Sequence, residues 1–377
     1  MVKDISAMKL AILGASKPHL PLYLKAKEMG LETYCIAWAD GAYCKDFADH
    51  FCDISITDKE TIAQLCKAEG IDGIVSNALE IAVPTMAYVA EQCGFNGNSF
   101  DAACCAVNKR KMREAVSKYG ACPQPEFSVL LTDECYPKHF PVIIKPSDSS
   151  CSNGVTKVDC QEQIQAAIDR ARQASSSGEI LVEECVFGRE VSVESISYHG
   201  KHYVLTITDK ETTGAPYFVE IAHHQPSNLP IQIKEKLEIY VPRILDAIGL
   251  TNGASHAEFK IDNDGNIKFI EIGARGGGDF ISYNLVELST GYDYIKGMIE
   301  VALNIFTEPL NGPNRYSGVY FLSKNTSYIK EFIIKNKDQG WVVDSEIQDK
   351  PLQELQKSQD RTGYLIYQSN EKIYTLV

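Results

Sequence analysis

The sequence predicts a mixed fold, in which an α/β unit with a parallel sheet is followed by α+β structure and a small C-terminal α/β subdomain. Short apolar strands alternate with helical segments over about the first hundred residues, which is typical of a three-layered, Rossmann-like unit. The pattern then changes to paired strands interrupted by two helices, which is typical of α+β structure. A length of 377 residues is enough for two or three domains of roughly 100–200 residues each.

The first unit is built from short apolar strands that are each followed by a segment with helical spacing. Strands are expected at 9–13, 31–38 and 71–76, and helices at 18–29, 57–69 and 80–92. The turn after the first strand, Gly14-Ala15-Ser16, lacks the full G-x-G-x-x-G pattern. The glycines that bring a backbone close to a pyrophosphate are therefore missing, which disfavours a dinucleotide-dependent dehydrogenase.

A Lys/Arg-rich helix over 101–120 ends the first unit, and after a proline-bearing linker at 122–125 comes the second unit. Its strands are expected at 140–145, 155–158, 180–186, 190–197, 203–208, 256–261 and 267–272, with helices at 161–174 and 234–248. After Pro313 we expect strands at 318–322, 341–345 and 362–368 and a helix near 328–335. These changes predict domains at 1–105, 106–310 (with a lid subdomain at about 123–190) and 311–377.

Composition excludes several classes of function. The net charge of −13 and the sequence pI near 5.2 argue against a surface for nucleic acid or anionic membranes. No apolar stretch approaches the roughly 18 residues of a membrane span, and the apolar run at 10–13 is too short for a signal peptide. The 12 cysteines form no C-x-x-C pair. We therefore expect a cytoplasmic protein with reduced thiols and without nucleic-acid or membrane partners.

The most informative segment is a hairpin at 256–273. Asp264-Gly265 predicts a two-residue type I′ turn, and counting outward places Glu258 opposite Glu271 and His256 opposite Gly273. Two glutamates opposite each other on one face are destabilising unless something neutralises them. A divalent cation such as Mg²⁺, which carboxylates and substrate phosphates commonly hold together, would explain the pair. The alternative is that both glutamates extend into solvent.

Several cationic and glycine-rich pieces accompany this hairpin. Arg275 is followed by three glycines and Asp279, a pattern suited to a transferring phosphoryl group or an oxyanion. Lys145 ends an apolar strand and leads into a polar loop at 147–154, which is not a Walker A loop. Lys109 is a second candidate cation on its basic helix. Each lysine has a plainer interpretation, as a residue at a strand edge or on a solvated helix face.

Taken together and in this order, these pieces resemble the ATP-grasp superfamily. The resemblance covers about residues 1–310 and rests on Lys109, the V-I-I-K-P strand, E-E-C-V followed by Glu190, and Glu258 and Glu271 with Arg275. It implies a pre-ATP-grasp domain, two α+β subdomains that grip ATP, and a small C-terminal subdomain that completes the unit.

The resemblance also implies residue roles. Lys109 and the catalytic Lys145 would contact the ATP phosphates, with Ser150 in the lid. Glu183 with the backbone of Glu184 and Val186 would hold adenine, and Glu190 would hold the ribose. Glu258 and Glu271 would bind Mg²⁺, with Mn²⁺ as an alternative, and Arg275 would stabilise the transferred phosphoryl group.

Two positions depart from the family pattern. The metal motif E-x-N-x-R reads here Glu271-Ile-Gly273-Ala-Arg275, so one metal ligand is missing. Our hypothesis is that His256 fills the gap directly or through water. The lid also carries Cys151 where glycine is frequent.

The implied chemistry is carboxylate activation. ATP would convert a substrate carboxylate into an acylphosphate, and an amine would then displace phosphate. The segment at 217–226 and the R-G-G-G-D run resemble the L-amino-acid ligase and carbamoyl-phosphate-synthase-like branch, in which Glu220 would hold a substrate amine and Arg275 and Gly277 the carboxyl end. His223 and His224 have a structural alternative as loop residues.

Three other functions remain open: a carboxyphosphate-using or purine-pathway type of ATP-grasp enzyme, a dehydrogenase, and a non-catalytic nucleotide-binding protein. Relatives of this kind are often dimers, so a homodimer is included among the expected partners.

Overall fold

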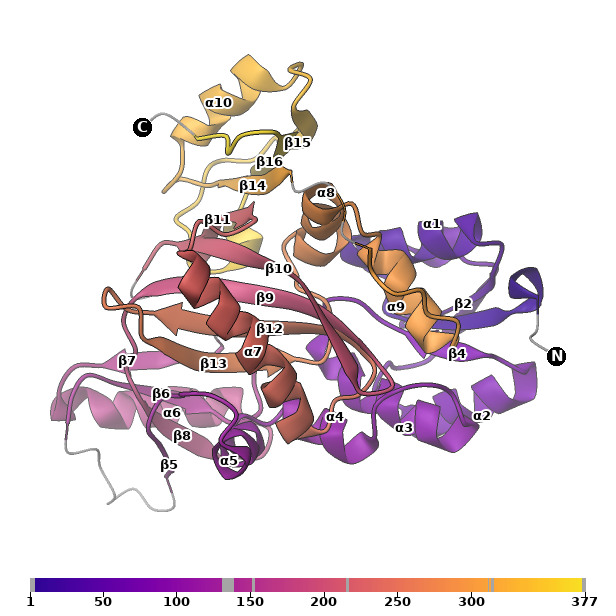
Figure 1. Cartoon of the computed structure of the whole chain (residues 1–377), viewed down its shortest axis with the longest axis horizontal. Helices are drawn as coiled ribbons and strands as arrows, with labels where there is room; N and C mark the ends of the chain where they lie inside the picture. Colours follow the sequence, from indigo (N-terminus) through magenta and orange to yellow (C-terminus); the bar gives the residue numbers. More distant parts are fainter. Residues whose placement is uncertain are drawn as a thin grey trace.

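A computed structural model describes residues 4–130, 139–150, 153–214, 217–310, 312 and 315–374. Within these residues, three β-sheets carry the fold, with helices packed around them (Figure 1). The lid position Cys151 and the boundary residue Pro313 lie outside the described residues.

The N-terminal sheet is parallel, as predicted, with the strand order β3-β2-β1-β4. Its strands are β1 (Lys9–Leu13), β2 (Glu32–Ala37), β3 (His50–Asp53) and β4 (Gly73–Val75), and its helices are α1 (Leu20–Glu28), α2 (Lys59–Glu69) and α3 (Val83–Cys93). Strand β3 was not predicted. It is only four residues long and none of them is fully buried, so it lacks the apolar run that marks its neighbours.

The basic segment predicted as one helix over 101–120 is two helices, α4 (Phe100–Ala106) and α5 (Lys109–Tyr119). Asn108 separates them because its backbone is extended and its side chain accepts a hydrogen bond from the Lys111 N–H, as an N-cap does. This break frees the backbone N–H of Lys109 to donate to the carbonyl of Ser147 at 2.7 Å. The new helix start therefore ties Lys109 to the polar loop.

The largest sheet has eight strands in the order β13-β12-β9-β10-β11-β14-β16-β15. Its strands are β9 (Arg189–Tyr198), β10 (Lys201–Thr212), β11 (Glu220–Gln225), β12 (Gly253–Ile261), β13 (Ile267–Gly273), β14 (Tyr316–Leu322), β15 (Val342–Ile347) and β16 (Gly363–Ser369). Helix α7 (Ile231–Ile248) covers one face of this sheet (Figure 1). The C-terminal strands extend the same sheet, with α10 (Tyr328–Asn336) beside them.

A small antiparallel sheet in the order β5-β8-β6-β7 lies at the lower left of Figure 1. It consists of β5 (Phe127–Val129), β6 (Val142–Pro146), β7 (Thr156–Val158) and β8 (Ile180–Glu184), with α6 (Ile164–Ala174) packed on it. The antiparallel arrangement agrees with the predicted α+β character of this part of the chain.

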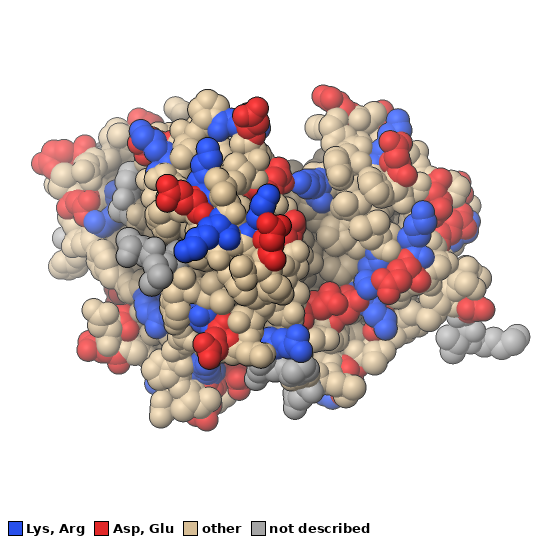
Figure 2. Space-filling view, turned by 90° about the horizontal axis from the view of Figure 1, so that it is seen from above, with Lys and Arg blue, Asp and Glu red and all other residues tan. Residues whose placement is uncertain are grey.

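The N-terminal sheet and the large sheet share a buried core. Helices α8 (Val286–Thr290) and α9 (Tyr294–Ala302) pack between them, and α9 contacts both α1 and β4. The predicted domain boundaries stay predictions. Figure 2 shows acidic and basic side chains interspersed over one face of the molecule, without a broad basic area there. Within the described ranges, no helix has the length and apolar character needed to cross a membrane.

Candidate functional site

The β12–β13 hairpin places the two predicted carboxylates opposite each other, as expected, but its turn and its pairing near the turn differ from the prediction. Glu258 pairs with Glu271 and His256 with Gly273, which confirms the predicted register at these positions. The two-residue turn is wrong, because the Asp262 N–H bonds the Asn266 carbonyl around a three-residue loop. This shifts the pairing by one residue near the turn. A β-bulge at 270 then restores the predicted pairing.

Arg113 on α5 stabilises this bulge. Its guanidinium is almost fully buried and donates to the carbonyls of Phe269 at 3.2 Å and Ile270 at 2.7 Å. The same guanidinium forms a two-pronged ion pair with Glu183, at 2.9 and 3.1 Å. A bulge leaves backbone groups outside the strand ladder, and here a buried arginine supplies partners for their carbonyls.

Glu183 also binds the predicted phosphate cation. Its second oxygen lies 2.7 Å from Lys145 Nζ, so one buried carboxylate joins two buried cations. Burial alone would raise the pKa of Glu183, but Lys145 and Arg113 outweigh it and hold the pKa at about 2. Burial lowers the pKa of Lys145 despite this partner.

Lys109 lies one helical turn before Arg113 on α5 and contacts the hairpin at Glu271. Its ammonium lies 3.0 Å from Glu271 Oε2 and donates to the Ser149 carbonyl at 2.7 Å. A cleft of about 350 Å³ is lined by Lys109, Glu271, Ser149 and Ser150, among others. The structure therefore brings together the predicted lid, one predicted phosphate ligand and one predicted metal ligand.

The other predicted metal ligand, Glu258, is held by a residue that the sequence analysis missed. Lys210 is buried on β10 and lies 2.5 Å from Glu258, 3.4 Å from Glu190 and 3.3 Å from Glu220. Three carboxylates with separate predicted roles thus converge on one ammonium. The predicted strand ended at 208, whereas β10 continues to Thr212, and its pairing with β9 places Lys210 opposite Glu190.

His256 is occupied by two carboxylates. Nδ1 lies 2.6 Å from Glu194 Oε1 and Nε2 lies 3.1 Å from Glu258 Oε1. Burial lowers the pKa of His256, but Glu194 and Glu258 more than offset it and raise the pKa to about 9. A protonated imidazole donates from both nitrogens and has no lone pair for a metal. This geometry does not support His256 as the direct ligand that replaces the missing asparagine.

Arg275 lies beside the hairpin and pairs with the N-terminal unit. Its Nε donates to Glu80 Oε2 at 3.0 Å and its Nη1 donates to the Gly276 carbonyl at 3.0 Å. Glu80, in the turn before α3, was also missed. It is distant in sequence from the predicted motifs, so no local signal indicated it.

The predicted substrate residues form a chain of alternating charges. Glu220 forms an ion pair with Lys210 and accepts a hydrogen bond from Arg361, which also pairs with Asp279 at 2.8 Å. Gly277 lies against His256, because a Cβ there would be 2.8 Å from Nδ1. His223 Nε2 lies 3.8 Å from Asp279.

His224 is not part of this chain of charges. It is buried against Tyr367, with which it forms a 2.9 Å hydrogen bond.

The residues predicted to hold adenine lie at the end of β8. The Glu184 N–H donates to the Glu126 carbonyl at 2.8 Å, and its carboxylate lies 3.2 Å from Lys268 Nζ. Val186 follows the strand and is half-buried, beside the exposed Phe187. Strand β8 ends at Glu184, so the backbone after Glu184 is not paired within the sheet.

The donor set suits a hard cation bound together with phosphates. Within the described part of the chain, no three His, Cys, Asp or Glu side chains are grouped so as to hold a metal by themselves. Glu258 and Glu271 nevertheless lie opposite each other, and each has a lysine ammonium beside it. Mg²⁺ is commonly held by one or two carboxylates together with substrate phosphates, so the two glutamates fit it.

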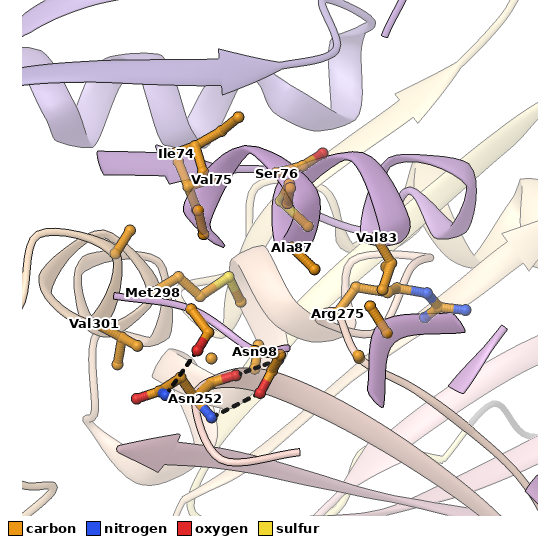
Figure 3. A pocket seen from close by; sticks show the side chains of 18 of the residues that line it. Ile74, Val75, Ser76, Val83, Ala87, Asn98, Asn252, Arg275, Met298 and Val301 are labelled. Carbon is orange, nitrogen blue, oxygen red and sulfur yellow. Dashed lines mark hydrogen bonds between the residues drawn. The ribbon is translucent and has the colours of Figure 1, made fainter. Parts of the chain in front are cut away.

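A second, apolar cavity of about 80 Å³ lies between α3, α4, α9 and the start of β12. Figure 3 shows Arg275 at one end of it, with the guanidinium directed away from the apolar side chains. Asn98 and Asn252 are hydrogen-bonded to each other at another part of the lining.

Comparisons with known proteins show what this chain is similar to. Residues 138–283 match the ATP-grasp domain model. Alanine–anticapsin ligase of Bacillus subtilis (strain 168) is 26% identical over 253 residues, which cover 60% of this chain and 52% of that protein. The chain thus spans about half the length of that relative. D-Alanine–D-alanine ligase of Hydrogenovibrio crunogenus is 26% identical over 252 residues, covering 58% and 79% of the two chains.

Solved structures show the same fold over nearly the whole chain. The L-amino acid ligase of Bacillus licheniformis superimposes with a TM-score of 0.80 at 21% identity, covering 97% of this chain and 94% of that one. Phosphoribosylglycinamide synthetase of Anaerococcus prevotii superimposes with a TM-score of 0.77, also at 21% identity and with the same coverage of both chains. The predicted resemblance and fold class are confirmed.

Proposed function

We propose that this chain, whose residues 138–283 form an ATP-grasp domain, is an ATP- and Mg²⁺-dependent carboxylate–amine ligase. The observation that carries the proposal is the Glu258–Glu271 pair, flanked by Lys109 and Lys210. Opposed carboxylates between cations form a site for a metal and a polyphosphate. The names of the relatives, alanine–anticapsin ligase and D-alanine–D-alanine ligase, support a small amino acid as the acid substrate.

The phosphates of ATP would lie in the cleft lined by Lys109, Ser149, Ser150 and Glu271, and the rest of the nucleotide would extend toward the small sheet. Lys109 and Lys145 would contact the phosphates, Ser150 would belong to the loop that covers them, and Glu190 would accept a hydrogen bond from the ribose. Adenine would lie against the backbone at Glu184 and Val186. The Glu183 carboxylate is fully engaged by Arg113 and Lys145, so we assign it the role of positioning Lys145 rather than of touching adenine.

Glu258 and Glu271 would hold Mg²⁺, with Mn²⁺ as a substitute. When bound, the metal neutralises the charge of the β- and γ-phosphates and orients them. Lys210 and His256 hold Glu258 in place and in its charged form. Lys109 holds Glu271 in the same way.

The reaction requires no nucleophile from the protein. A carboxylate oxygen of the acid attacks the γ-phosphorus, the bond from that phosphorus to the bridging oxygen breaks, and ADP leaves. The amine nitrogen then attacks the acyl carbon, loses a proton and displaces phosphate. The contribution of the chain is orientation, charge neutralisation and exclusion of water. Arg275 would stabilise the negative charge that develops in both steps.

The acid substrate would lie beside Glu220. This carboxylate contacts Lys210, which also faces Glu190 and Glu258, and Arg361, which also pairs with Asp279, so acidic groups outnumber cations here and suit a substrate ammonium. A zwitterionic amino acid would add no net charge to such a site, with its ammonium at Glu220 and its carboxylate toward Arg275 and the backbone at Gly277.

The experiment is phosphate release from Mg-ATP against pools of amino acids, with and without bicarbonate, and with Glu271→Gln as the blank. Release that requires two amino acids and yields ADP supports the ligase. Release with bicarbonate alone supports a carboxyphosphate-using enzyme instead. Nucleotide binding without release in any pool supports a non-catalytic nucleotide-binding protein. A cytoplasmic location and a homodimer stay predictions.

A further inference from the structure

We infer that Glu80 is a positioning residue for Arg275, and that position 273 is glycine because this ion pair fills the space of its side chain. The N-terminal unit would then contribute a residue to the site. This inference rests on the proposed function, in which Arg275 stabilises the transferred phosphoryl group.

The contacts of Arg275 leave its guanidinium little freedom. Nε donates to Glu80 Oε2 and Nη1 donates to the Gly276 carbonyl, both at 3.0 Å. Both charged side chains are only about one-fifth exposed. An ion pair that is largely removed from water is oriented more strongly than an exposed one. The side of Arg275 away from its charge borders the apolar cavity, which supports the same orientation (Figure 3).

Gly273 leaves room for the pair. A Cβ at this position would lie 3.0 Å from Glu80 Oε2, 3.1 Å from Arg275 Nε and 3.3 Å from Arg275 Cζ. Gly273 lies in β13 and is not among the glycines with positive φ, so its backbone conformation does not require glycine. Space is therefore the reason for glycine here, and the atoms that need the space belong to the Glu80–Arg275 pair.

The pair also keeps Arg275 away from the metal carboxylates. Glu258 and Glu271 are the other acidic groups whose charge acts on Arg275. Without Glu80, the guanidinium would turn toward them and compete with Mg²⁺. Glu80 therefore positions the cation beside the metal site while leaving both glutamates available.

The test compares Glu80→Gln with a control at the same interface. Lys25→Ala removes the Lys25–Asp293 ion pair, which joins α1 to the start of α9 at 2.8 Å and lies outside the proposed machinery. For Glu80→Gln we expect kcat to fall on the order of 10- to 100-fold, as for a misplaced catalytic group. We expect KM for ATP to change less than about twofold, since the binding of the nucleotide in the ground state is kept. We expect the Mg²⁺ requirement to rise, because Arg275 would then compete with Mg²⁺ for the two glutamates. Lys25→Ala should leave all three unchanged.

Two further measurements separate positioning from general damage. Gly273→Asn should lower kcat in the wild-type background, and Glu80→Ala should remove most of that penalty, because it empties the space that the asparagine needs. The Nε–H signal of Arg275 in a ¹H–¹⁵N spectrum, assigned with Arg275→Lys, should be protected from exchange in the wild type and in Lys25→Ala and should lose protection in Glu80→Gln.

The spectrum decides the inference independently of turnover. If no substrate pool supports phosphate release but the Nε–H signal depends on Glu80, the proposed function fails and the positioning holds. If Glu80→Gln leaves the signal protected, or if Gly273→Asn and Glu80→Ala are simply additive, the inference is overturned.

Discussion

Two clusters of buried charges flank the β12–β13 hairpin, and they have opposite charge balances. On the side of the small sheet, one carboxylate, Glu183, is shared by Lys145 and Arg113. On the side of β10, one ammonium, Lys210, is shared by three carboxylates. The first cluster has a surplus of positive charge and suits an anion such as a triphosphate. The second has a surplus of negative charge and suits a metal ion or a substrate ammonium.

This difference shows how a chain with a net charge of −13 can bind ATP. Its overall charge would repel a polyphosphate, but the field that matters is local, and a low-dielectric surrounding strengthens it. The three-residue cluster around Glu183 supplies the positive potential. The Lys210 cluster supplies oxygen donors a short distance away, across the hairpin.

Glu183→Gln breaks the first cluster and should have the largest effect. It leaves two buried cations without their carboxylate, which costs about 3–5 kcal/mol of unfolding free energy for a buried pair that loses one partner. Chemical denaturation measures this. ADP or inorganic phosphate should restore part of the loss, because an anion that binds only the folded state stabilises it.

The neighbouring Glu184→Gln is the control for this variant, because the Glu184 side chain is exposed and its pairing with Lys268 is at the surface. We expect Glu184→Gln to lower the unfolding free energy by less than about 1 kcal/mol. Equal effects of the two substitutions would contradict the assignment of the anion-binding cluster.

Lys210→Met breaks the second cluster and should respond to the opposite kind of ligand. Three carboxylates would then face one another without their cation, which lowers stability by an amount comparable to other broken buried pairs, about 3 kcal/mol. Mg²⁺ without nucleotide should stabilise this variant more than the wild type, and phosphate should not. Thermal unfolding with each ligand separates the two clusters.

Lys260→Met is the matched control, since Lys260 lies 3.9 Å from Glu190 at the edge of the cluster and is more exposed. If phosphate rather than Mg²⁺ rescued Lys210→Met, the proposed division between an anion-binding and a cation-binding cluster would be wrong.

Two buried histidines extend the comparison to pH. Among the residues that the structure describes, no carboxylate pairs with His19. Burial lowers its pKa to about 4, although a hydrogen bond with the Ser16 backbone acts to raise it. His256 lies between two carboxylates and has a pKa of about 9. The stabilisation due to His256 is therefore present below its unfolded pKa and is lost as the pH rises through 9.

For His19 the sign is reversed. Between its folded pKa of about 4 and its unfolded pKa near 6.5, the unfolded chain binds the additional proton, so stability falls as the pH falls through this window. The expected contribution is about 3 kcal/mol from the linkage relation. Denaturation at pH 7 and pH 4.5 with His19→Gln measures it, since the variant should lose less stability on acidification than the wild type. Equal losses would show that His19 is not the group responsible.

The sequence predicted most of the elements but few of the contacts between them. Apolar strands and capped helices are local features, so β1, β2 and α2 were found close to their observed bounds. The short strand β3 has no apolar run, and the break at Asn108 depends on a cap within a strongly helical segment. Both are cases in which a local competing preference outweighed periodicity.

The candidate site divides in the same way. Lys145, Glu183 and Arg275 lie at or just after the ends of strands and could be identified by position. Lys210 was missed because the strand that carries it was predicted too short, and Glu80 was missed because only the packing of the N-terminal unit brings it to Gly273. His256 was placed in the right register, but its two carboxylate partners were needed to show that it is not free to bind a metal.

The smallest predicted effect concerns the turn that was predicted incorrectly. Gly265 has a φ of +79°, which an alanine adopts only with strain, and a Cβ there would lie 3.2 Å from Ile233 Cδ1. Gly265→Ala should therefore cost about 1 kcal/mol of unfolding free energy. Gly340→Ala is the control, because Gly340 has no positive φ and no atom would lie within 4 Å of its Cβ. We expect that substitution to be neutral or slightly stabilising.

The same variant tests what fixes the metal carboxylates. The bulge at 270 and its hydrogen bond from Arg113 lie between the turn and the Glu258–Glu271 pair. A change in the geometry of the turn should therefore not alter the positions of these two glutamates. Gly265→Ala should thus leave the Mg²⁺ dependence of turnover, or of nucleotide binding, as in the wild type. A shifted Mg²⁺ dependence would mean that the turn sets the register of the pair and that Arg113 does not hold the bulge independently.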